Sequence, residues 1–307
     1  MEGDIISSIY SMRSRKYKRS QKRKSRKAVK KFYFIGGTGE DKCIFVPLHG
    51  GLGNQMFIYA AAIMVKNKKG IPLCILPSGN NPHKASSDYT KTLYKQGTSV
   101  DPESVKERMK VSKSVLDKIT NPHNTWVNGN IDGNATANAT LNCTFFQSYS
   151  SILPVIPTIR EDCAKVFQET YPDVKIDSDG SAFMHVRRGD YGGRSLSADY
   201  YNRGLAELDS ISKLKDVYIV SDDMGWCKSQ EWKTAKKIIF FEDPDELKTM
   251  YMMSLCLAGA IISASSFSTW GAILGADKNP ESVILYPTSW ITGPSTQLQF
   301  PARWKAI

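Results

Sequence analysis

The sequence contains no run of 18 or more apolar residues, and its first residues form no continuous apolar stretch. A helix needs about 20 predominantly apolar residues to cross a bilayer, and a secretory signal peptide needs an apolar core. The sequence therefore predicts neither a membrane span nor a cleaved leader. We expect a soluble, cytoplasmic protein.

Cysteine motifs that would bind a metal are also absent. No Cys-x-x-Cys pair occurs among the six cysteines, and none of them clusters with histidine, so a structural zinc site is not expected. Several cysteines stand in apolar runs, where a small buried thiol is the simplest interpretation, although the sequence does not exclude disulfides. The six are Cys43, Cys74, Cys143, Cys163, Cys227 and Cys256.

The net charge of +11 is concentrated at the amino terminus. Residues 1–31 carry 12 Lys and Arg against two acidic residues, whereas the other 276 residues carry 29 basic and 28 acidic side chains. Because the rest is nearly neutral, we expect no dedicated nucleic-acid site. Blocks of like charge are usually disordered, so residues 1–31 are predicted to be a basic, solvated tail that could contact anionic surfaces.

Three N-glycosylation sequons follow one another between Asn134 and Thr144. If they are used, they indicate passage through a secretory compartment. The alternative is a low-complexity loop of Asn, Ala and Thr. Because no leader or membrane span is expected, we favour the loop and keep the secretory pathway as the alternative.

Short apolar runs alternate with helical patterns through the second half of the chain. Strands are expected over 182–186, 216–220, 237–241, 260–262 and 283–286, and helices over 158–170, 197–211 and 245–257. Strands of this length between helices indicate βαβ units and a parallel sheet. In the first half, a strand over 43–48 precedes a helix over 56–68, and another helix is expected over 102–118. The sequence therefore predicts an α/β protein.

Three of these strands end in polar clusters. The clusters are Arg187-Arg188-Gly189-Asp190, Ser221-Asp222-Asp223 and the serine-rich run 263–268. Carboxyl ends of parallel strands meet at one edge of a sheet, where ligands bind, and the arginine fork suits phosphate oxygens. The serines begin a helix, whose amino terminus can bind phosphate or be capped by serine. The pattern indicates a nucleotide site; solvated turns are the alternative.

A glycine-rich loop, Gly50-Gly51-Leu52-Gly53-Asn54-Gln55-Met56, follows the first predicted strand. It is not a dinucleotide fingerprint, because Met56 stands where the third glycine would be. The glycines permit a tight turn and a close approach of the backbone to a ligand. A plain strand-to-helix turn is the alternative. His49 precedes the loop, and a lone histidine is more often structural than catalytic.

Five ordered motifs together resemble the α-1,2-fucosyltransferase family, glycosyltransferase family eleven. They begin at Gly50, Phe146, His185, Ser221 and Ser265 and span residues 50 to 272, most of the chain. The resemblance implies a GT-B-type enzyme with two Rossmann-like domains facing across a cleft. We place the acceptor-side domain with the glycine loop at residues 32–155 and the nucleotide-sugar-binding domain at 156–307. Animal members usually carry an amino-terminal membrane anchor, which we do not expect here.

The resemblance implies inverting transfer of L-fucose from GDP-β-L-fucose to a glycan acceptor, an oligosaccharide or a glycoconjugate. The expected target is the 2-OH of a galactose-like residue. Another linkage, or a catalytically silent glycan- or nucleotide-binding protein of the same fold, is the alternative. No metal or other cofactor is expected, because arginines and a helix terminus can neutralise the departing diphosphate.

Roles for the reacting groups follow from the same resemblance. Arg187 is expected to bind the diphosphate, with Arg188 assisting it or pairing within the fold. Asp190 is a base or orienting carboxylate, or else an ion-pair partner of Arg188. Asn54 is expected to touch the reacting groups from the glycine loop.

The remaining donor-binding candidates come from four of the five motifs. His185 is expected to read the guanine edge. The others are Gly51, Gly53, Asp222, Ser266, Phe267 and Ser268. One position departs from the family, since Thr249 stands where an aspartate usually binds the base. Guanine would then be held by another group, such as Asp222 or Glu246, or nucleotide selectivity would be looser.

Overall fold

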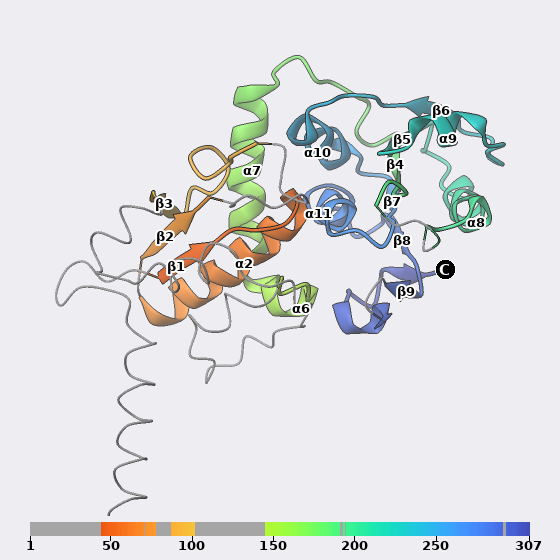
Figure 1. Cartoon of the computed structure of the whole chain (residues 1–307). Coiled ribbons are helices and arrows are strands. Elements are labelled where there is room, and N and C mark those ends of the chain that lie inside the picture. The colour runs from red at the N-terminus through yellow and green to blue at the C-terminus, as the bar shows by residue number, and fades with distance from the viewer. Residues whose placement is uncertain are drawn as a thin grey trace, which may run out of the picture.

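The computed structural model describes residues 44–70, 72–77, 87–101, 145–190, 193, 195–290 and 293–307. The basic tail, the helix expected over 102–118 and the sequons lie outside these residues. Figure 1 shows an α/β protein with one main sheet in each half of the chain, and β9 (Ser289–Trp290) and β10 (Gly293–Pro294) form a separate two-stranded antiparallel sheet. Both main sheets are parallel throughout.

The sheet of the first half has the order β1-β2-β3, with strands Ile44–Pro47, Leu73–Leu76 and Gly97–Ser99. Helix α2, Leu52–Lys69, connects β1 to β2 and ends at Gly70, whose φ of 64° is the left-handed conformation that favours glycine. The helix begins four residues before the predicted 56, so Gly53 and Asn54 belong to its first turn. The glycine loop is therefore half helix.

The sheet of the second half has six strands in the order β11-β8-β7-β4-β5-β6. They are Lys305–Ala306, Val283–Tyr286, Gly259–Ile261, Ser181–Val186, Asp216–Ser221 and Lys237–Phe240. Numbered along the chain from β4, this order is 3-2-1-4-5-6, that of a Rossmann fold. The predicted α/β class with parallel sheets is confirmed.

Four helices connect the strands of this second sheet. They are α8 at Ala198–Asp209, α9 at Met224–Ser229, α10 at Glu246–Leu255 and α11 at Ser266–Leu274. The predicted helices over 197–211 and 245–257 correspond to α8 and α10. The remaining short elements of this half are η3 at Ala276–Lys278, β9 at Ser289–Trp290, β10 at Gly293–Pro294 and η4 at Ser295–Leu298.

The two halves are joined by α6 at Tyr149–Ile152, η1 at Leu153–Val155 and α7 at Ile156–Thr170. Helix α7 is the bridging helix predicted over 158–170, and it contacts both halves. Asp162 accepts a hydrogen bond from Gln96 Nε2 of the first half at 2.9 Å, whereas Arg160 Nε donates to the carbonyl of Ile273 of the second half at 2.9 Å.

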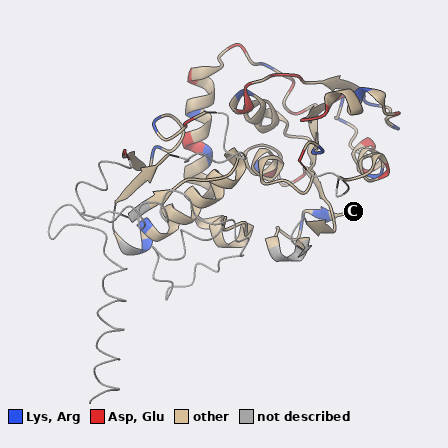
Figure 2. Ribbon diagram, in the orientation of Figure 1, with Lys and Arg blue, Asp and Glu red and all other residues tan. Residues whose placement is uncertain are grey.

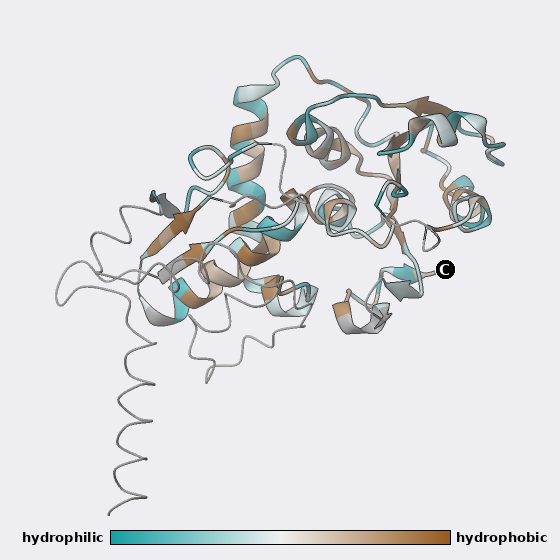
Figure 3. Cartoon of the chain, viewed as in Figure 1, coloured by the Kyte–Doolittle hydropathy of each residue, from teal (hydrophilic) through white to brown (hydrophobic). Residues whose placement is uncertain are grey.

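The halves share one hydrophobic core. Its members include Met56 and Phe57 of α2 as well as Met253 of α10 and Trp270 of α11. The rings of Phe57 and Trp270 lie 5.2 Å apart between their centroids. Figure 3 shows apolar residues along the strands and on the helices that pack between the sheets. Burial of apolar surface therefore holds α2 against α11.

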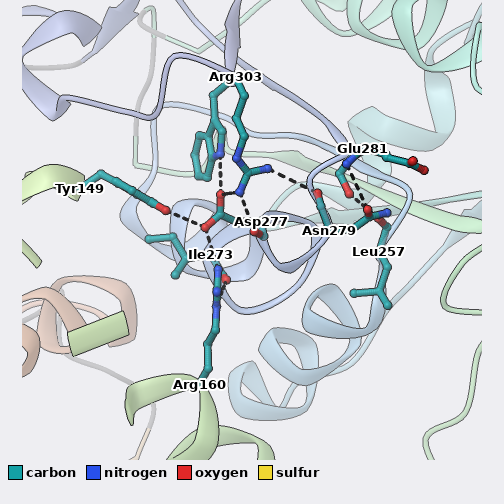
Figure 4. Close-up of polar contacts among 10 residues, drawn as sticks. Tyr149, Arg160, Leu257, Ile273, Asp277, Asn279, Glu281 and Arg303 are labelled. Atoms are coloured by element: carbon teal, nitrogen blue, oxygen red, sulfur yellow. Dashed lines mark hydrogen bonds and ion pairs between the residues drawn. The ribbon is translucent and has the colours of Figure 1, made fainter. Parts of the chain in front are cut away.

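A buried carboxylate fixes the carboxyl-terminal segment to the rest of the fold. Figure 4 shows Asp277 of η3 surrounded by donors from three parts of the chain. Tyr149 Oη and Arg160 Nη2 donate to its Oδ2, each at 2.7 Å, while Trp304 Nε1 donates to its Oδ1 at 2.9 Å and Arg303 forms an ion pair with it. Since Asp277 is 5% exposed, these donors replace the water that a buried charge loses.

Cysteine burial only partly follows the sequence-based interpretation. Cys163, Cys227 and Cys256 are buried free thiols, and burial raises the pKa of each. Cys74, in the apolar strand β2, is disulfide-bonded, the alternative that the sequence did not exclude. Among the described residues, no helix has the length and apolarity that a bilayer crossing requires.

Candidate active site

The topology of the second sheet places two loops at its switch point. Strands β4 and β7 are neighbours, but the chain leaves them in opposite directions across the sheet, toward β5 and β8. In an open α/β sheet, ligands bind beyond the carboxyl ends of the strands at this point. The loop after β4 carries Arg187, and the loop after β7 leads through Ser263 into α11.

Asp222, after β5, holds the loop that follows β4. Its Oδ1 accepts from the backbone N–H of Arg188 at 2.8 Å, and its Oδ2 accepts from that of Gly189 at 3.0 Å. A Cβ at residue 189 would lie 2.8 Å from Oδ2, so a larger residue there would displace the Asp222 carboxylate. The same Oδ2 lies 3.1 Å from Arg187 Nη1. Asp222 thus shapes the loop and orients Arg187.

The two arginines of the loop have different surroundings. Arg188 lies 4.0 Å above the ring centroid of Trp226 and is 3.2 Å from Asp223 Oδ2, so it is held within the fold. Arg187 Nε donates to Asp190 Oδ1 at 2.9 Å, and the Arg187 side chain stays 34% exposed. The ion pair considered between Asp190 and Arg188 is therefore wrong: Asp190 pairs with Arg187.

His185 lies on β4 and is buried beside the switch point. Its Nδ1 and Ser263 Oγ are 2.7 Å apart, and its ring centroid is 5.7 Å from that of Phe267. Burial and, second, the charge of Arg187 lower the pKa of His185 to about 3. The imidazole is therefore neutral at physiological pH. Contact of His185 with guanine stays a prediction.

His49, at the end of β1, is neutral for a similar reason. Burial lowers its pKa to about 4, and its ring packs on Phe145 at 4.6 Å between centroids. Neither ring nitrogen has a hydrogen-bond partner among the residues that the structure describes. The histidine before the glycine loop therefore packs as a buried aromatic ring.

These two histidines are expected to make the fold less stable in mild acid. Each has a folded-state pKa below its ordinary 6.5, so the unfolded chain binds the extra proton first and stability falls as pH drops from 6.5 toward 4. We expect each histidine to cost about 1.4 kcal/mol of unfolding free energy per pH unit in that window. Urea unfolding at pH 7, 6 and 5 measures the slope.

Glutamine substitutions provide the control for this pH dependence. His185→Gln and His49→Gln remove one titrating group each, so each variant should lose about half of the slope, whatever its stability at pH 7. An equal slope in both variants and the wild type would contradict the assignment.

The amino termini of α2 and α11 meet beside the switch point of the second sheet. A Cβ added at Gly53 would lie 2.4 Å from the backbone nitrogen of Phe267, so only glycine permits this contact. Neither helix has an acidic residue in its first turn (Figure 2), and Gly51 provides no side-chain cap for α2. Two positive helix ends therefore converge beside the switch point, which favours an anionic ligand.

The serines at the start of α11 have partners within the protein. Ser265 caps the helix, since its Oγ accepts from the N–H of Phe267 at 3.3 Å. Ser266 Oγ donates to Asn54 Oδ1 at 2.7 Å. Ser268 is fully buried and donates to the carbonyl of Ser265 at 3.1 Å. Capping is thus observed, and contact of these residues with phosphate stays a prediction.

Asn54 connects three of the five motifs. Its Oδ1 accepts from Ser266 Oγ of α11 and from Gln147 Nε2 of the segment before α6, each at 2.7 Å. Gln147 belongs to a recognised motif but was not predicted as a site residue. Its position follows from Phe146, whose φ of 51° is unusual for a bulky residue and turns the backbone there.

The two carboxylates considered in place of the family's aspartate already have partners within the fold. Thr249 is buried on α10. Glu246 Oε1 accepts from Tyr89 Oη at 3.3 Å, and Asp222 is engaged by the loop after β4. A guanine contact by either carboxylate would compete with these bonds and stays a prediction. Within the described ranges, no three His, Cys, Asp or Glu side chains group together as metal ligands.

The sequence is similar to those of known proteins. A model of glycosyl transferase family 11 matches residues 23–295. Alpha-1,2-colitosyltransferase of Escherichia coli is 27% identical over 275 residues, covering 79% of this chain and 90% of that protein. O-antigen biosynthesis glycosyltransferase WbnK of Escherichia coli is 23% identical over 162 residues, 49% of this chain and 53% of its own length, so that match spans about half of WbnK.

Two solved structures are similar at low identity. Fucosyltransferase NodZ from Bradyrhizobium has a TM-score of 0.46 and 14% identity, covering 82% of this chain and 97% of that one. Heptosyltransferase WaaC of E. coli with ADP-2-deoxy-2-fluoro heptose has a TM-score of 0.44 and 6% identity, covering 86% and 93%. Because the family model covers most of the sequence, the resemblance drawn from the five motifs is confirmed, and the chain belongs to glycosyl transferase family 11.

Proposed function

We propose that this glycosyltransferase transfers L-fucose from GDP-β-L-fucose to the 2-OH of a galactose-like residue in a glycan acceptor, with inversion at the anomeric carbon. The observation that carries the proposal is the convergence of Arg187 and two helix amino termini at the switch point of the second sheet. That arrangement suits a sugar diphosphate. The name of the colitosyltransferase relative supports the α-1,2 linkage.

In the proposed reaction the acceptor oxygen attacks the anomeric carbon as the bond to the diphosphate breaks. GDP leaves with the electron pair of that bond, and the acceptor loses its proton to a base. Arg187 would neutralise the charge that grows on the departing oxygens. Asp190 now pairs with Arg187 at 2.8 Å. We assign Asp190 the role of orienting the Arg187 guanidinium, and we keep Asp190 as the candidate base.

A second candidate function is colitosyl transfer. Colitose is fucose without its 3-hydroxyl, so one sugar pocket could take either donor. The α-1,2-colitosyltransferase relative, at 27% identity over 90% of its length, favours this candidate. Discrimination between the donors would depend on a hydrogen bond to the 3-hydroxyl, because leaving a buried polar group unpaired is costly.

GDP release tests the function directly. The full chain is incubated with GDP-fucose, GDP-colitose or GDP-mannose and an array of galactose-terminated acceptors, and the linkage of the product is determined. We expect acceptor-dependent GDP release and an α-1,2 product with GDP-fucose. Faster turnover of GDP-colitose would favour the second candidate. A melting temperature that rises with GDP, without turnover of either donor, would show a silent binding protein and overturn both.

Catalysis is proposed to need no metal. The arginines and helix ends described above can offset the diphosphate charge without a cation. We therefore expect GDP release to be unchanged in excess EDTA. Loss of activity on chelation, restored by magnesium or manganese, would contradict this.

A further inference from the structure

Of the two polar atoms of the Asn54 amide, only Oδ1 has hydrogen-bond partners among the described residues. A side-chain amide has one acceptor oxygen and one donor NH₂ group. Both partners of Asn54, Ser266 and Gln147, donate to Oδ1. Within the described part of the chain, Nδ2 has no acceptor, and the residue is partly exposed.

The electrostatic surroundings favour this orientation of the amide. Oδ1 lies against the first residue of α11, and Asn54 itself lies in the first turn of α2. The positive ends of both helices stabilise an acceptor oxygen there. The opposite orientation would place the NH₂ group against these ends and remove the two acceptor contacts. Nδ2 is therefore directed toward Gly50, where a Cβ would lie 2.9 Å from it.

Gln147 is itself held firmly. It is 6% exposed and follows Phe146, whose φ of 51° lies in the left-handed region. A non-glycine residue in that region is strained and persists where its surroundings fix it. The N–H of Ser148 donates to the carbonyl of Phe146 at 2.7 Å and closes the turn. This turn directs Gln147 Nε2 toward Asn54.

We propose that Gln147 and Ser266 are positioning residues that fix the Asn54 amide, so that its Nδ2 donates a hydrogen bond to the sugar diphosphate at the switch point. The inference rests on the proposed function, because it names the ligand of that same site. Gln147 acts through Asn54 and need not touch the substrate. A hydrogen bond that strengthens as charge develops on the leaving group lowers the barrier more than it improves binding.

Gln147→Glu is the decisive substitution. A carboxylate cannot donate to Oδ1, and it attracts Nδ2, so the amide should turn away from the ligand. We expect kcat to fall about 10–100-fold with KM for the donor within about threefold, the pattern of a lost transition-state contact. Gln147→Met, which cannot attract Nδ2, should cost about 3–10-fold. Gln96→Glu is the matched control, because Gln96 Nε2 also donates to a side-chain oxygen, that of Asp162; kcat should not change.

A double-mutant cycle separates positioning from simple structural support. In an Asn54→Ala background, Gln147→Glu should have no further effect on kcat, because the group it positions is gone. Independent, multiplicative losses in the double variant would overturn the proposal. The cycle uses whichever donor the wild type turns over, so failure of the fucosyl assignment alone does not affect it.

Nuclear magnetic resonance tests the orientation without any turnover. In asparagine-labelled protein, the Asn54 side-chain NH₂ signal is identified by its loss in Asn54→Asp. We expect nuclear Overhauser contacts from this NH₂ group to the α protons of Gly50, and a shift of its resonance when GDP is added. Contacts to the amide protons at the start of α11 would place the NH₂ group there and overturn the proposal.

Discussion

Replacing Arg187 with alanine is expected to abolish sugar transfer and to weaken GDP binding strongly, without unfolding the protein. The guanidinium lies at the switch point, partly exposed, between the carboxylates of Asp190 and Asp222. Losing a charge-assisted phosphate contact costs about 2–5 kcal/mol, which corresponds to roughly 30- to 5,000-fold in rate. GDP affinity by calorimetry and GDP release measure the two effects.

Arg203→Ala is the matched control for this substitution. Arg203 pairs with Asp199 on the exposed side of α8, and its side chain is 55% exposed. Its removal should change neither affinity nor rate. Arg187→Lys should restore only part of the activity, because an ammonium group cannot form the two parallel bonds of the guanidinium. Near-normal turnover by Arg187→Ala would contradict the placement of the phosphate site at the switch point.

The largest loss of stability is expected from Asp277→Asn. The carboxylate is buried and binds two arginines, a tyrosine and a tryptophan. Removing one partner of a buried ion pair costs about 3–5 kcal/mol, because the remaining charges lack compensation. For a protein of this size, the melting temperature should fall by roughly 6–20 °C.

Asp199→Asn provides the comparison for Asp277→Asn. Its ion pair with Arg203 is on the surface, with the Asp199 side chain 79% exposed, so the melting temperature should change by no more than a degree or two. Below its own melting temperature, the Asp277→Asn protein should keep its KM for the donor, because η3 follows the carboxyl end of α11 and the proposed donor site lies at the opposite end. Similar melting temperatures for the two variants would contradict the importance of the Asp277 network.

The sequence predicted the apolar strands of the second sheet, but it missed β2, although all four of its residues are buried. Strands β4, β5 and β8 read as apolar runs because helices or chain segments cover both sides of a parallel sheet. It did not predict β3, whose sequence is Gly-Thr-Ser, or β11, whose two residues are exposed. These two strands form because a neighbouring strand offers hydrogen bonds. Their own residues give no sign of this pairing.

The site residues show the same division. The five motifs identified which segments carry Arg187, Asn54 and Ser266. Their partners depend on how distant segments meet, since Gln147 is 93 residues from Asn54 and Ser266 is 212 residues from it. Asp190 pairs with Arg187 and not with Arg188, and this pairing depends on the turn at Gly189. Asp222, which follows a different strand, holds that turn by accepting a hydrogen bond from the Gly189 N–H.

The shared core has a consequence for synthesis of the chain. Phe57 of α2 packs on Trp270 of α11, 213 residues later in the sequence (270 minus 57). At roughly 5–20 residues per second, the apolar face of α2 would leave the ribosome some 10–40 s before the helix that covers it. During that interval the first half exposes an unpaired apolar surface. Nascent chains that stop before α11 should therefore aggregate or be bound by chaperones, and no fragment ending there is expected to fold alone.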